Sequence, residues 1–363
     1  MRLLALVTDA YGGYGGIAQY SRDFLESAIS ASFVDEVVVL PRTLHSQHFV
    51  TPPKLRQLPP HRSRLSYSIE ALRQCVRARP DVIYCGHLYH GPLALLLARL
   101  FNARLIIQLH GDEIWKPVSK LYRTPLEQCD RLIAVSHDTR DRALAVASPQ
   151  HDSFSVISCT VGPQFVPGDR QSARDKFKID SREKVVLSVA RLDGREDARG
   201  YKGHDLVMDL VARQNQDGEK IRYLIAGDGD DRERLVQLAD RLGISNLVDF
   251  LGIVPAEDLP DLYRAADLFA LPSTGEGFGI VFVESMACGT PAIGLNVGGS
   301  PDALCHGELG HCSSLEGFPA LFTASLISSG TRDPDLARRT RERFGFAVFR
   351  RRVLDILQPL IRN

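Results

Sequence analysis

What this sequence lacks excludes several kinds of protein. It has no excess of either charge, because 44 Lys and Arg residues match 44 Asp and Glu residues. A chain without a general basic field is not drawn to a nucleic-acid backbone, so we expect no nucleic-acid partner. No apolar run reaches the roughly 20 residues that a membrane-spanning helix needs. The sequence also lacks low-complexity tracts, and we expect it to fold along most of its length.

We also expect neither a leader peptide nor a disulfide framework. Residues 1–9 contain a short apolar run without a small-residue cleavage pattern, and this run predicts a first buried strand. The seven cysteines are odd in number and scattered, as in a cytoplasmic enzyme with reduced thiols. One cluster has metal-capable side chains, Cys305-His306 with His311-Cys312. Because its paired ligands lack the usual two-residue gap, a plain turn is favoured over a zinc site.

Charge concentrates in one place, the arginine-rich C-terminal segment. This segment fits a solvated helix face, or a peripheral contact with anionic lipid on the inner face of the cytoplasmic membrane. The arginines concerned are Arg338, Arg339, Arg341, Arg343, Arg350, Arg351 and Arg352.

Short β-branched runs alternate with helical patterns from end to end, which is typical of α/β proteins with parallel sheets covered by helices on both faces. The length of 363 residues suits two such domains. The periodicity stops near Pro163, Pro167 and Gly168, which indicate a linker. We therefore predict two Rossmann-like doubly wound domains, residues 1–165 and 166–343, facing a central cleft. The strands are expected near 3–7, 37–40, 81–85, 105–109, 132–136, 155–158, 185–189, 223–226, 248–250, 268–271 and 292–295, with helices including 17–28, 69–78, 205–214, 231–242 and 259–266.

The most informative motif is the segment 272–291, which follows a predicted strand and opens a helix. Gly277 and Gly279 allow a ligand close to the backbone, and the first helical turn favours a phosphate. Glu276 and Glu284 can accept hydrogen bonds from the hydroxyls of a sugar and a ribose on either side of a diphosphate. The alternative is a helix start with two solvated glutamates.

Two further segments of the second half support a phosphate ligand. Arg191 ends a predicted strand and Lys202 precedes a helix, so both can reach the strand ends. Two cations there would neutralise a diphosphate and stabilise it as a leaving group, although surface cations in a loop are the alternative. The turn Gly227-Asp228-Gly229 also follows a strand and suits backbone contacts to a base.

The first half contributes a glycine loop and a histidine. Gly15 and Gly16 follow the first strand and could cradle a phosphate, but the loop lacks the G-x-G-x-x-G spacing of a dinucleotide site. His110 ends an apolar strand and precedes a glycine, which places its imidazole at the edge of the predicted cleft. A lone histidine in a strand is otherwise usually structural.

Together these motifs resemble the retaining glycosyltransferases of family GT4, also called glycosyl transferases group 1, which have the GT-B fold. The likeness covers nearly the whole chain, and its most specific element is the pair Glu276 and Glu284. The resemblance implies that Glu276 contacts the donor sugar, that Glu284 binds the ribose, and that His110 faces the reacting carbon. Arg191 and Lys202 would hold the diphosphate. The remaining donor-binding positions that it implies are Gly15, Gly16, Gly227, Asp228, Gly229, Gly277, Phe278, Gly279, Ile280 and Val281.

The same resemblance implies the reaction and the roles of the domains. Residues 1–165 would bind the acceptor, residues 166–343 the donor, and the C-terminal helix 344–363 would cross back onto the first domain. The donor would be a UDP- or GDP-sugar, with mannose slightly favoured, and no metal or other cofactor would be essential. The acceptor would be lipid-linked or a glycan, in the synthesis of cell-surface polysaccharide or glycolipid.

Two departures from the family pattern stand out. Cys159-Thr-Val-Gly-Pro163 replaces the usual Asn-Gly-Val-Asp, and the loop 193–200 is longer than in many members. Two other functions stay open at this point, a nucleotide-sugar 2-epimerase of the same fold and a non-catalytic partner in glycan assembly.

Overall fold

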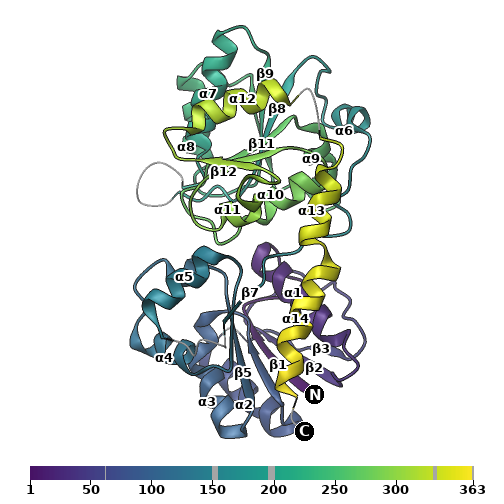
Figure 1. Cartoon of the computed structure of the whole chain (residues 1–363), viewed down its shortest axis with the longest axis vertical. Coiled ribbons are helices and arrows are strands. Elements are labelled where there is room, and N and C mark those ends of the chain that lie inside the picture. Colours follow the sequence, from purple (N-terminus) through teal and green to yellow (C-terminus); the bar gives the residue numbers. More distant parts are fainter. Residues whose placement is uncertain (62, 149–153, 195–200, 330–332, 362–363) are drawn as a thin grey trace. The chain divides into compact units, whose positions relative to one another are not determined.

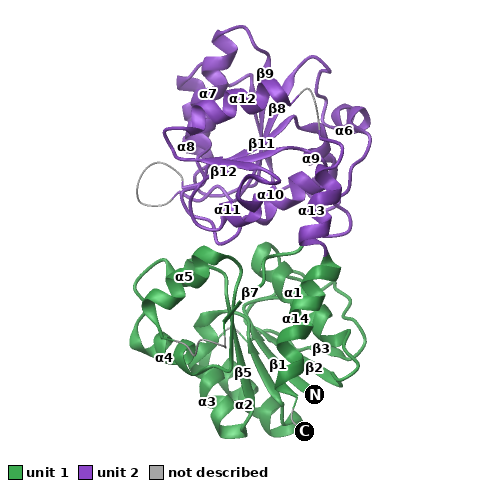
Figure 2. Ribbon diagram, viewed as in Figure 1, with its two compact units in different colours: residues 1–160, 346–363 green, residues 161–345 purple. Residues whose placement is uncertain are grey.

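The computed structural model describes residues 1–61, 63–148, 154–194, 201–329 and 333–361. The chain divides into two compact units, unit 1 with residues 1–160 and 346–363, and unit 2 with residues 161–345 (Figure 2). Each unit contains one parallel sheet with alternating helices, so the predicted α/β class is confirmed (Figure 1).

Unit 1 contains a seven-stranded sheet in the order β3-β2-β1-β4-β5-β6-β7. The chain runs outward from β1 in one direction and then from β4 in the other, so the order reverses between β1 and β4. Ligands of open α/β sheets bind at such a reversal, beside the carboxyl ends of the strands. The strands are β1 (Arg2–Val7), β2 (Glu36–Pro41), β3 (Leu55–Gln57), β4 (Val82–Cys85), β5 (Arg104–Leu109), β6 (Arg131–Ala134) and β7 (Phe154–Val156).

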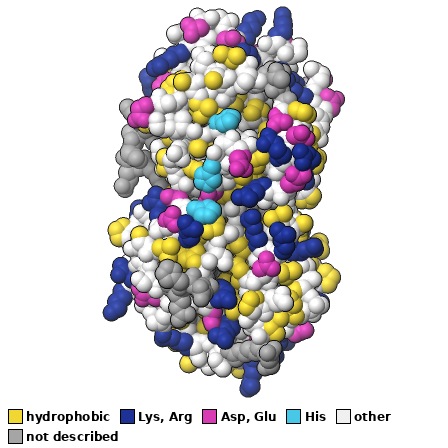
Figure 3. All heavy atoms as spheres, viewed as in Figure 1, with side chains coloured by type: hydrophobic (Ala, Val, Ile, Leu, Met, Phe, Trp, Pro, Cys, Tyr) yellow, Lys and Arg dark blue, Asp and Glu magenta, His cyan; other side chains and the backbone are white. Residues whose placement is uncertain are grey.

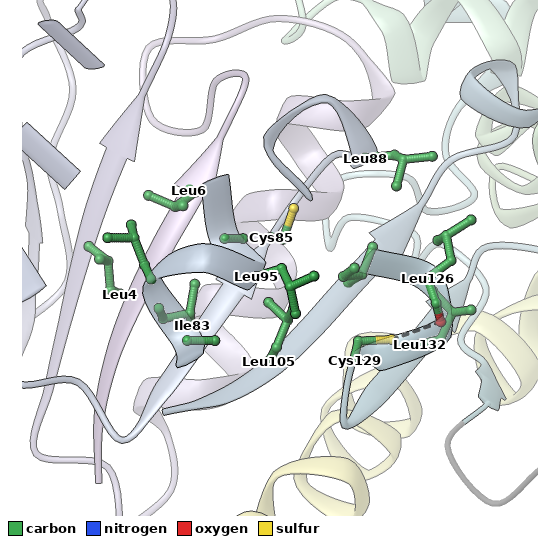
Figure 4. Packing of buried hydrophobic residues seen from close by; sticks show 14 of the residues in the cluster. Leu4, Leu6, Ile83, Cys85, Leu88, Leu95, Leu105, Leu126, Cys129 and Leu132 are labelled. Atoms are coloured by element: carbon green, nitrogen blue, oxygen red, sulfur yellow. Dashed lines mark hydrogen bonds between the residues drawn. The ribbon is translucent and has the colours of Figure 1, made fainter. Parts of the chain in front are cut away.

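The two faces of this sheet are covered by different helices. Successive residues of a strand point to opposite faces, and β4 shows this directly. Tyr84 stacks on Phe24 of α1 with ring centroids 3.9 Å apart, whereas Ile83 and Cys85 join a core with α2, α3 and α4. Figure 4 shows this second core, in which Leu95 and Leu126 approach strand residues such as Leu105 and Leu132. The helices of unit 1 are α1 (Gly16–Ile29), α2 (Arg64–Ala78), α3 (Gly91–Phe101), α4 (Lys120–Gln128), α5 (His137–Val146) and α14 (Phe346–Leu357), with short 3-10 turns η1 (Leu88–His90), η2 (Asp112–Ile114) and η5 (Gln358–Leu360).

Unit 2 contains a six-stranded parallel sheet in the order β10-β9-β8-β11-β12-β13. Its strands are β8 (Lys184–Val189), β9 (Ile221–Ala226), β10 (Val248–Gly252), β11 (Leu268–Leu271), β12 (Ala292–Leu295) and β13 (His311–Ser313). Its helices are α6 (Arg170–Lys176), α7 (His204–Gln216), α8 (Arg232–Arg241), α9 (Leu259–Ala265), α10 (Ile280–Ala287), α11 (Ser300–Ala303), α12 (Phe318–Ser328) and α13 (Leu336–Phe344), with the 3-10 turn η4 (Cys305–Gly307).

Two strands differ from the prediction, β3 and β13. Each has only three residues, Leu55-Arg56-Gln57 and His311-Cys312-Ser313, and contains no β-branched side chain, so neither shows the hydrophobic run that predicts a strand. The prediction of a plain turn from Cys305 to Cys312 is therefore wrong at its end, because His311 pairs with Ile293 of β12. His306 lies 3.1 Å from Asp302 of α11, whereas within the described residues Cys305, His311 and Cys312 belong to no group with the spacing of metal ligands.

The C-terminal segment forms two helices and not one. They are separated at Gly345, whose extended backbone pairs with Val161 in unit 2. After this break α14 packs against α1 of unit 1, where Phe349 meets the ring of Tyr20 edge-on at 5.3 Å. None of the described helices is both long and apolar enough to cross a membrane.

We expect Phe349→Ala to lower the free energy of unfolding by about 3 kcal/mol, because it leaves a cavity between α14 and α1. Phe349 is buried, whereas Arg350 beside it is exposed, so Arg350→Ala serves as the control. Urea unfolding of both variants measures the effect. Equal stability of the two variants would contradict the packing described for α14.

Candidate functional site

The candidate site of unit 2 is built by loops at one edge of its sheet. The strands β9, β8 and β11 are neighbours and parallel, so the loops that follow them leave from the same edge. Arg191 and Lys202 follow β8, Gly227 follows β9, and Glu276 follows β11. The topology therefore brings together the segments that the sequence analysis selected.

A buried ion pair joins two of these loops. The Nζ atom of Lys202 lies 2.5 Å from Oε1 of Glu276, and the two side chains are only 13% and 11% exposed. The ammonium also lies over the Tyr201 ring, 4.6 Å from its centroid. Burial lowers the pKa of Lys202, but the Glu276 carboxylate outweighs it and the pKa lies above its ordinary value. Lys202 is thus a fixed cation, and Glu276 is not a solvated glutamate.

Backbone contacts hold the two loops against each other. The Thr274 N–H donates to the Tyr201 carbonyl at 2.8 Å. Gly203 has a φ of 77°, and a Cβ there would lie 2.3 Å from the carbonyl oxygen of Pro272. Only glycine fits this close approach, so Gly203 positions Lys202. On its other side, Glu276 is held by a hydrogen bond from the Gly299 N–H to its carbonyl, at 2.8 Å.

The helix α10 begins where the sequence predicted, directly after Gly279. Gly279 has a φ of 88° and caps the helix, and Ile280 and Val281 form its first turn. The N–H groups of a first turn have no acceptor within the helix, so they can bind an anion. Phe278 is buried, and its ring packs against Phe344 at 5.7 Å, so only the backbone is available here. Gly277 is half-buried beside it.

Glu284 lies one turn further along α10 and has a different partner. The Tyr263 hydroxyl donates to its Oε2 at 2.8 Å. Burial raises the pKa of Glu284 to about 7, and the hydrogen bond from Tyr263 opposes this rise only in part. This carboxyl group therefore titrates near neutral pH, whereas an exposed glutamate is fully ionised there.

Arg191 and the turn 227–229 form the other side of the same edge. A hydrogen bond of 3.1 Å from the Leu192 N–H to the Asp228 carbonyl connects them. A Cβ on Gly227 would lie 1.8 Å from the Ala190 carbonyl, and one on Gly229 would lie 1.9 Å from the Leu192 carbonyl. These glycines are therefore required by the packing of the loops, whatever they bind.

The two loops also present polar side chains to solvent. Arg191 and Asp228 are both exposed, and within the described part of the chain Arg191 makes no ion pair. Of the long loop 193–200, residues 195–200 lie outside the described residues.

In unit 1, His110 lies at the carboxyl end of β5 and is buried. Its Nε2 lies 2.9 Å from the Gly86 carbonyl, which can only accept, so Nε2 carries a proton and Nδ1 is left as an acceptor. Tyr20 meets the ring edge-on at 5.5 Å. Burial, together with the neighbouring His87, lowers the pKa of His110 to about 4. His110 is thus neutral at physiological pH.

Two acidic residues beside His110 were not among the predicted site residues. Glu113 accepts the backbone N–H of His110 at 2.9 Å, and its other oxygen is buried without a partner in the described structure. His87, Asp112 and Glu113 lie close enough to hold a cation. However, Nδ1 of His87 accepts the Tyr89 N–H, which explains its placement by hydrogen bonding alone. The only sequence signal was the position of the two acids directly after His110-Gly111.

The glycine loop of unit 1 follows β1 and leads into α1. Gly15 has a φ of 87° and caps the helix, which starts at Gly16. Beside it, the carboxylate of Asp9 is buried within 3.8 Å of His45. A Cβ on Gly13 would lie 2.7 Å from that carboxylate, so the loop closes over Asp9. Asp9 was also missed, because a single acid after a strand carries no distinctive pattern.

Comparison with known proteins assigns both units. Residues 14–165 match the sequence model described as Glycosyltransferase Family 4, and residues 169–318 match the one described as Glycosyl transferases group 1. The chain belongs to glycosyltransferase family 4. The resemblance inferred from the motifs is thereby confirmed.

Relatives with assigned names match part of this family 4 chain. It is 36% identical over 221 residues to a D-inositol 3-phosphate glycosyltransferase of Mycobacterium sp. (strain KMS), over 59% of this chain and 47% of the relative. A protein of the same name from Rhodococcus jostii is 35% identical over 193 residues, over 50% of this chain and 41% of the relative. The matched region thus covers less than half the length of each of these relatives.

Solved structures match along the whole chain. A sucrose-phosphate synthase from Thermosynechococcus elongatus superimposes with a TM-score of 0.80 at 18% identity, over 99% of this chain and 98% of the other. Anabaena HepE, solved in complex with UDP, gives a TM-score of 0.77 at 20% identity, over 99% and 100%. At these identities the likeness is one of fold, and it confirms the predicted GT-B class.

We expect Glu284→Gln to remove a pH dependence of stability. The pKa of Glu284 is raised from 4.5 to about 7 on folding, so its protonation favours the folded state. This contribution is fully present below about pH 4.5 and is lost as the pH rises through about 7. The unfolding temperature of the wild type should therefore fall relative to that of Glu284→Gln across this range, as measured by calorimetry without nucleotide. Parallel profiles would contradict the raised pKa, and Glu233→Gln, which alters an exposed glutamate of α8, is the control.

Proposed function

We propose that this chain transfers a hexose from a nucleotide-diphosphate sugar to a lipid-linked or glycan acceptor, with retention of anomeric configuration. The observation that carries the proposal is the buried pair of Lys202 and Glu276, set at the strand ends just before α10. A fixed cation, a fixed carboxylate and a free helix N-terminus suit a ligand that is anionic at one end and rich in hydroxyls at the other.

The diphosphate would lie between Lys202 and the first turn of α10. Charge develops on this group as the bond from the anomeric carbon to the phosphate oxygen breaks, so cations and N–H groups already in place lower the barrier. Arg191, exposed at the same edge, would contact the phosphates from solvent. Glu276 would accept hydrogen bonds from sugar hydroxyls while holding Lys202 in position.

The nucleoside would extend along the rest of this edge. Glu284 would accept the ribose hydroxyls with the oxygen that Tyr263 does not occupy. The backbone of Gly227 and Gly229 would contact the base near Asp228. These glycines are already held against the loop that follows β8, so their backbone could contact the base without a rearrangement of the protein.

His110 would act as a neutral hydrogen-bond acceptor. With Nε2 bound to Gly86, Nδ1 can receive a sugar hydroxyl but cannot donate a proton. Gly15 and Gly16 would border the same substrate. During transfer the acceptor oxygen bonds to the anomeric carbon, the nucleotide diphosphate leaves, and its phosphate oxygen takes the acceptor proton. In this proposed transfer step, no protein side chain takes up or releases a proton, and no metal ion takes part.

The structure does not single out one donor base or one acceptor, so we propose a class for each. A UDP- or GDP-sugar fits the site, and the fold relative HepE was solved with UDP and with UDP-glucose. The relatives are named for an inositol phosphate, so small polyols are reasonable acceptors to test beside lipid-linked glycans. Mannose is the first sugar to test as the group transferred. We place the reaction on the cytoplasmic side of the membrane, where nucleotide sugars are made.

A donor panel tests the proposal. The protein is incubated with UDP-, GDP- and ADP-sugars, with and without acceptors, and nucleotide release is followed together with the anomeric configuration of the product. Release that requires acceptor supports transfer, and the rate should be unchanged by a chelator. Epimerised donor without release would favour a 2-epimerase. No binding of any donor would contradict the proposal.

We expect Glu276→Gln to lower kcat at least about 100-fold, because the sugar loses a charged acceptor and Lys202 loses its partner. Glu233→Gln on the exposed face of α8 should leave kcat unchanged. Calorimetry of both variants checks that the fold is kept. Near wild-type turnover of Glu276→Gln would show that the donor sugar lies elsewhere.

A further inference from the structure

The helix α2 is apolar on two faces. Its inner face carries Tyr67, Ala71 and Cys75, which are buried in the core against the sheet. Its outer face carries four aliphatic side chains, and their spacing of four, three and four residues places them in one stripe. A surface helix of a soluble protein normally has polar residues there. These side chains are Leu65, Ile69, Leu72 and Val76, which are 71%, 57%, 43% and 61% exposed.

The neighbouring helix α3 also exposes apolar side chains. The helices α2 and α3 are in contact, and α3 exposes Leu96 and Leu100, one turn apart, at 55% and 65%. We call these six side chains the α2–α3 apolar surface. Exposed hydrophobic side chains are common in folded proteins, and Figure 3 shows them over much of one face. Six on two helices that are in contact indicate a surface that binds a partner.

Exposed arginines accompany the apolar stripe of α2. Arg64, Arg73, Arg77 and Arg79 all lie on α2 or at its end and are exposed. The only acid of α2 is Glu70, and it is already within 3.6 Å of Arg73. The helix α3 contains Arg99 and no acid. The exposed charge of α2 and α3 is therefore mainly positive, which suits a partner that combines an apolar layer with negative charge.

The arginine-rich helix α13, by contrast, uses its charges within unit 2. Arg338 pairs with Asp335 and Glu342, and Arg339 pairs with Asp333. Arg341 donates to the carbonyls of Pro163 and Phe165. Three of the four arginines of α13 thus already have partners within unit 2, and two of these three pair with carboxylates.

We propose that the α2–α3 apolar surface docks on an anionic lipid bilayer. The aliphatic side chains would enter the boundary between headgroups and acyl chains, and the arginines would contact lipid phosphates, as in other interfacial helices. A second copy of the chain is a poorer occupant, because symmetric pairing of these helices would bring their arginines together. This surface goes beyond the transfer reaction and does not depend on it.

Vesicle binding of the full chain tests the proposal. Large vesicles of phosphatidylcholine alone, or of an equimolar mixture with phosphatidylglycerol, are sedimented with the protein. We expect binding to the anionic vesicles that weakens with salt. The double variant I69Q/V76Q should lower the partition coefficient at least about tenfold, and Arg73→Gln and Arg77→Gln by about fivefold each.

The control is Ile327→Gln, which changes a side chain of α12 in unit 2 that is 73% exposed, and it should bind as the wild type does. Calorimetry checks that all variants are folded. The proposal would be overturned if the wild-type protein does not bind anionic vesicles, or if the I69Q/V76Q variant binds them as strongly as the wild type. So would a wild-type dimer in sedimentation equilibrium that this variant dissociates, because a second copy would then be the occupant.

Discussion

The candidate site of unit 2 depends on the buried ion pair of Lys202 and Glu276. Removing two charges from water costs more than their attraction returns unless the geometry is good and other hydrogen bonds help. Here the desolvation free energy is offset because the two loops are held together by backbone contacts and by the close approach at Gly203, which fix the geometry of the pair. An arrangement that the fold does not need for its core is the kind found at functional sites.

The parallel sheet explains why these groups meet. The carboxyl ends of β9, β8 and β11 lie side by side, so three loops separated in sequence share one edge. The same rule let the sequence predict that these loops share one edge, because each selected segment follows a β-branched run. The strands β3 and β13 were not predicted, because their three residues include no β-branched side chain.

The helix α2 shows the limit of periodicity as a guide to burial. The segment 69–78 is amphipathic in sequence, but apolar side chains occur on two of its faces. Packing against the sheet selected Tyr67, Ala71 and Cys75 for the core and left Ile69 and Val76 in solvent. A repeat of apolar residues cannot state which face meets the sheet, since that depends on the strands that lie beneath the helix.

The sequence by itself determined the α/β class, the loops that follow the strands and the membership of family 4, because all three rest on local patterns along the chain. Only the tertiary structure decided the chemical state of the selected residues. It paired Lys202 with Glu276, gave Glu284 the Tyr263 hydroxyl, and buried His110 with its proton on Nε2. Burial and partners depend on segments far apart in the chain, and local patterns hold no information about them.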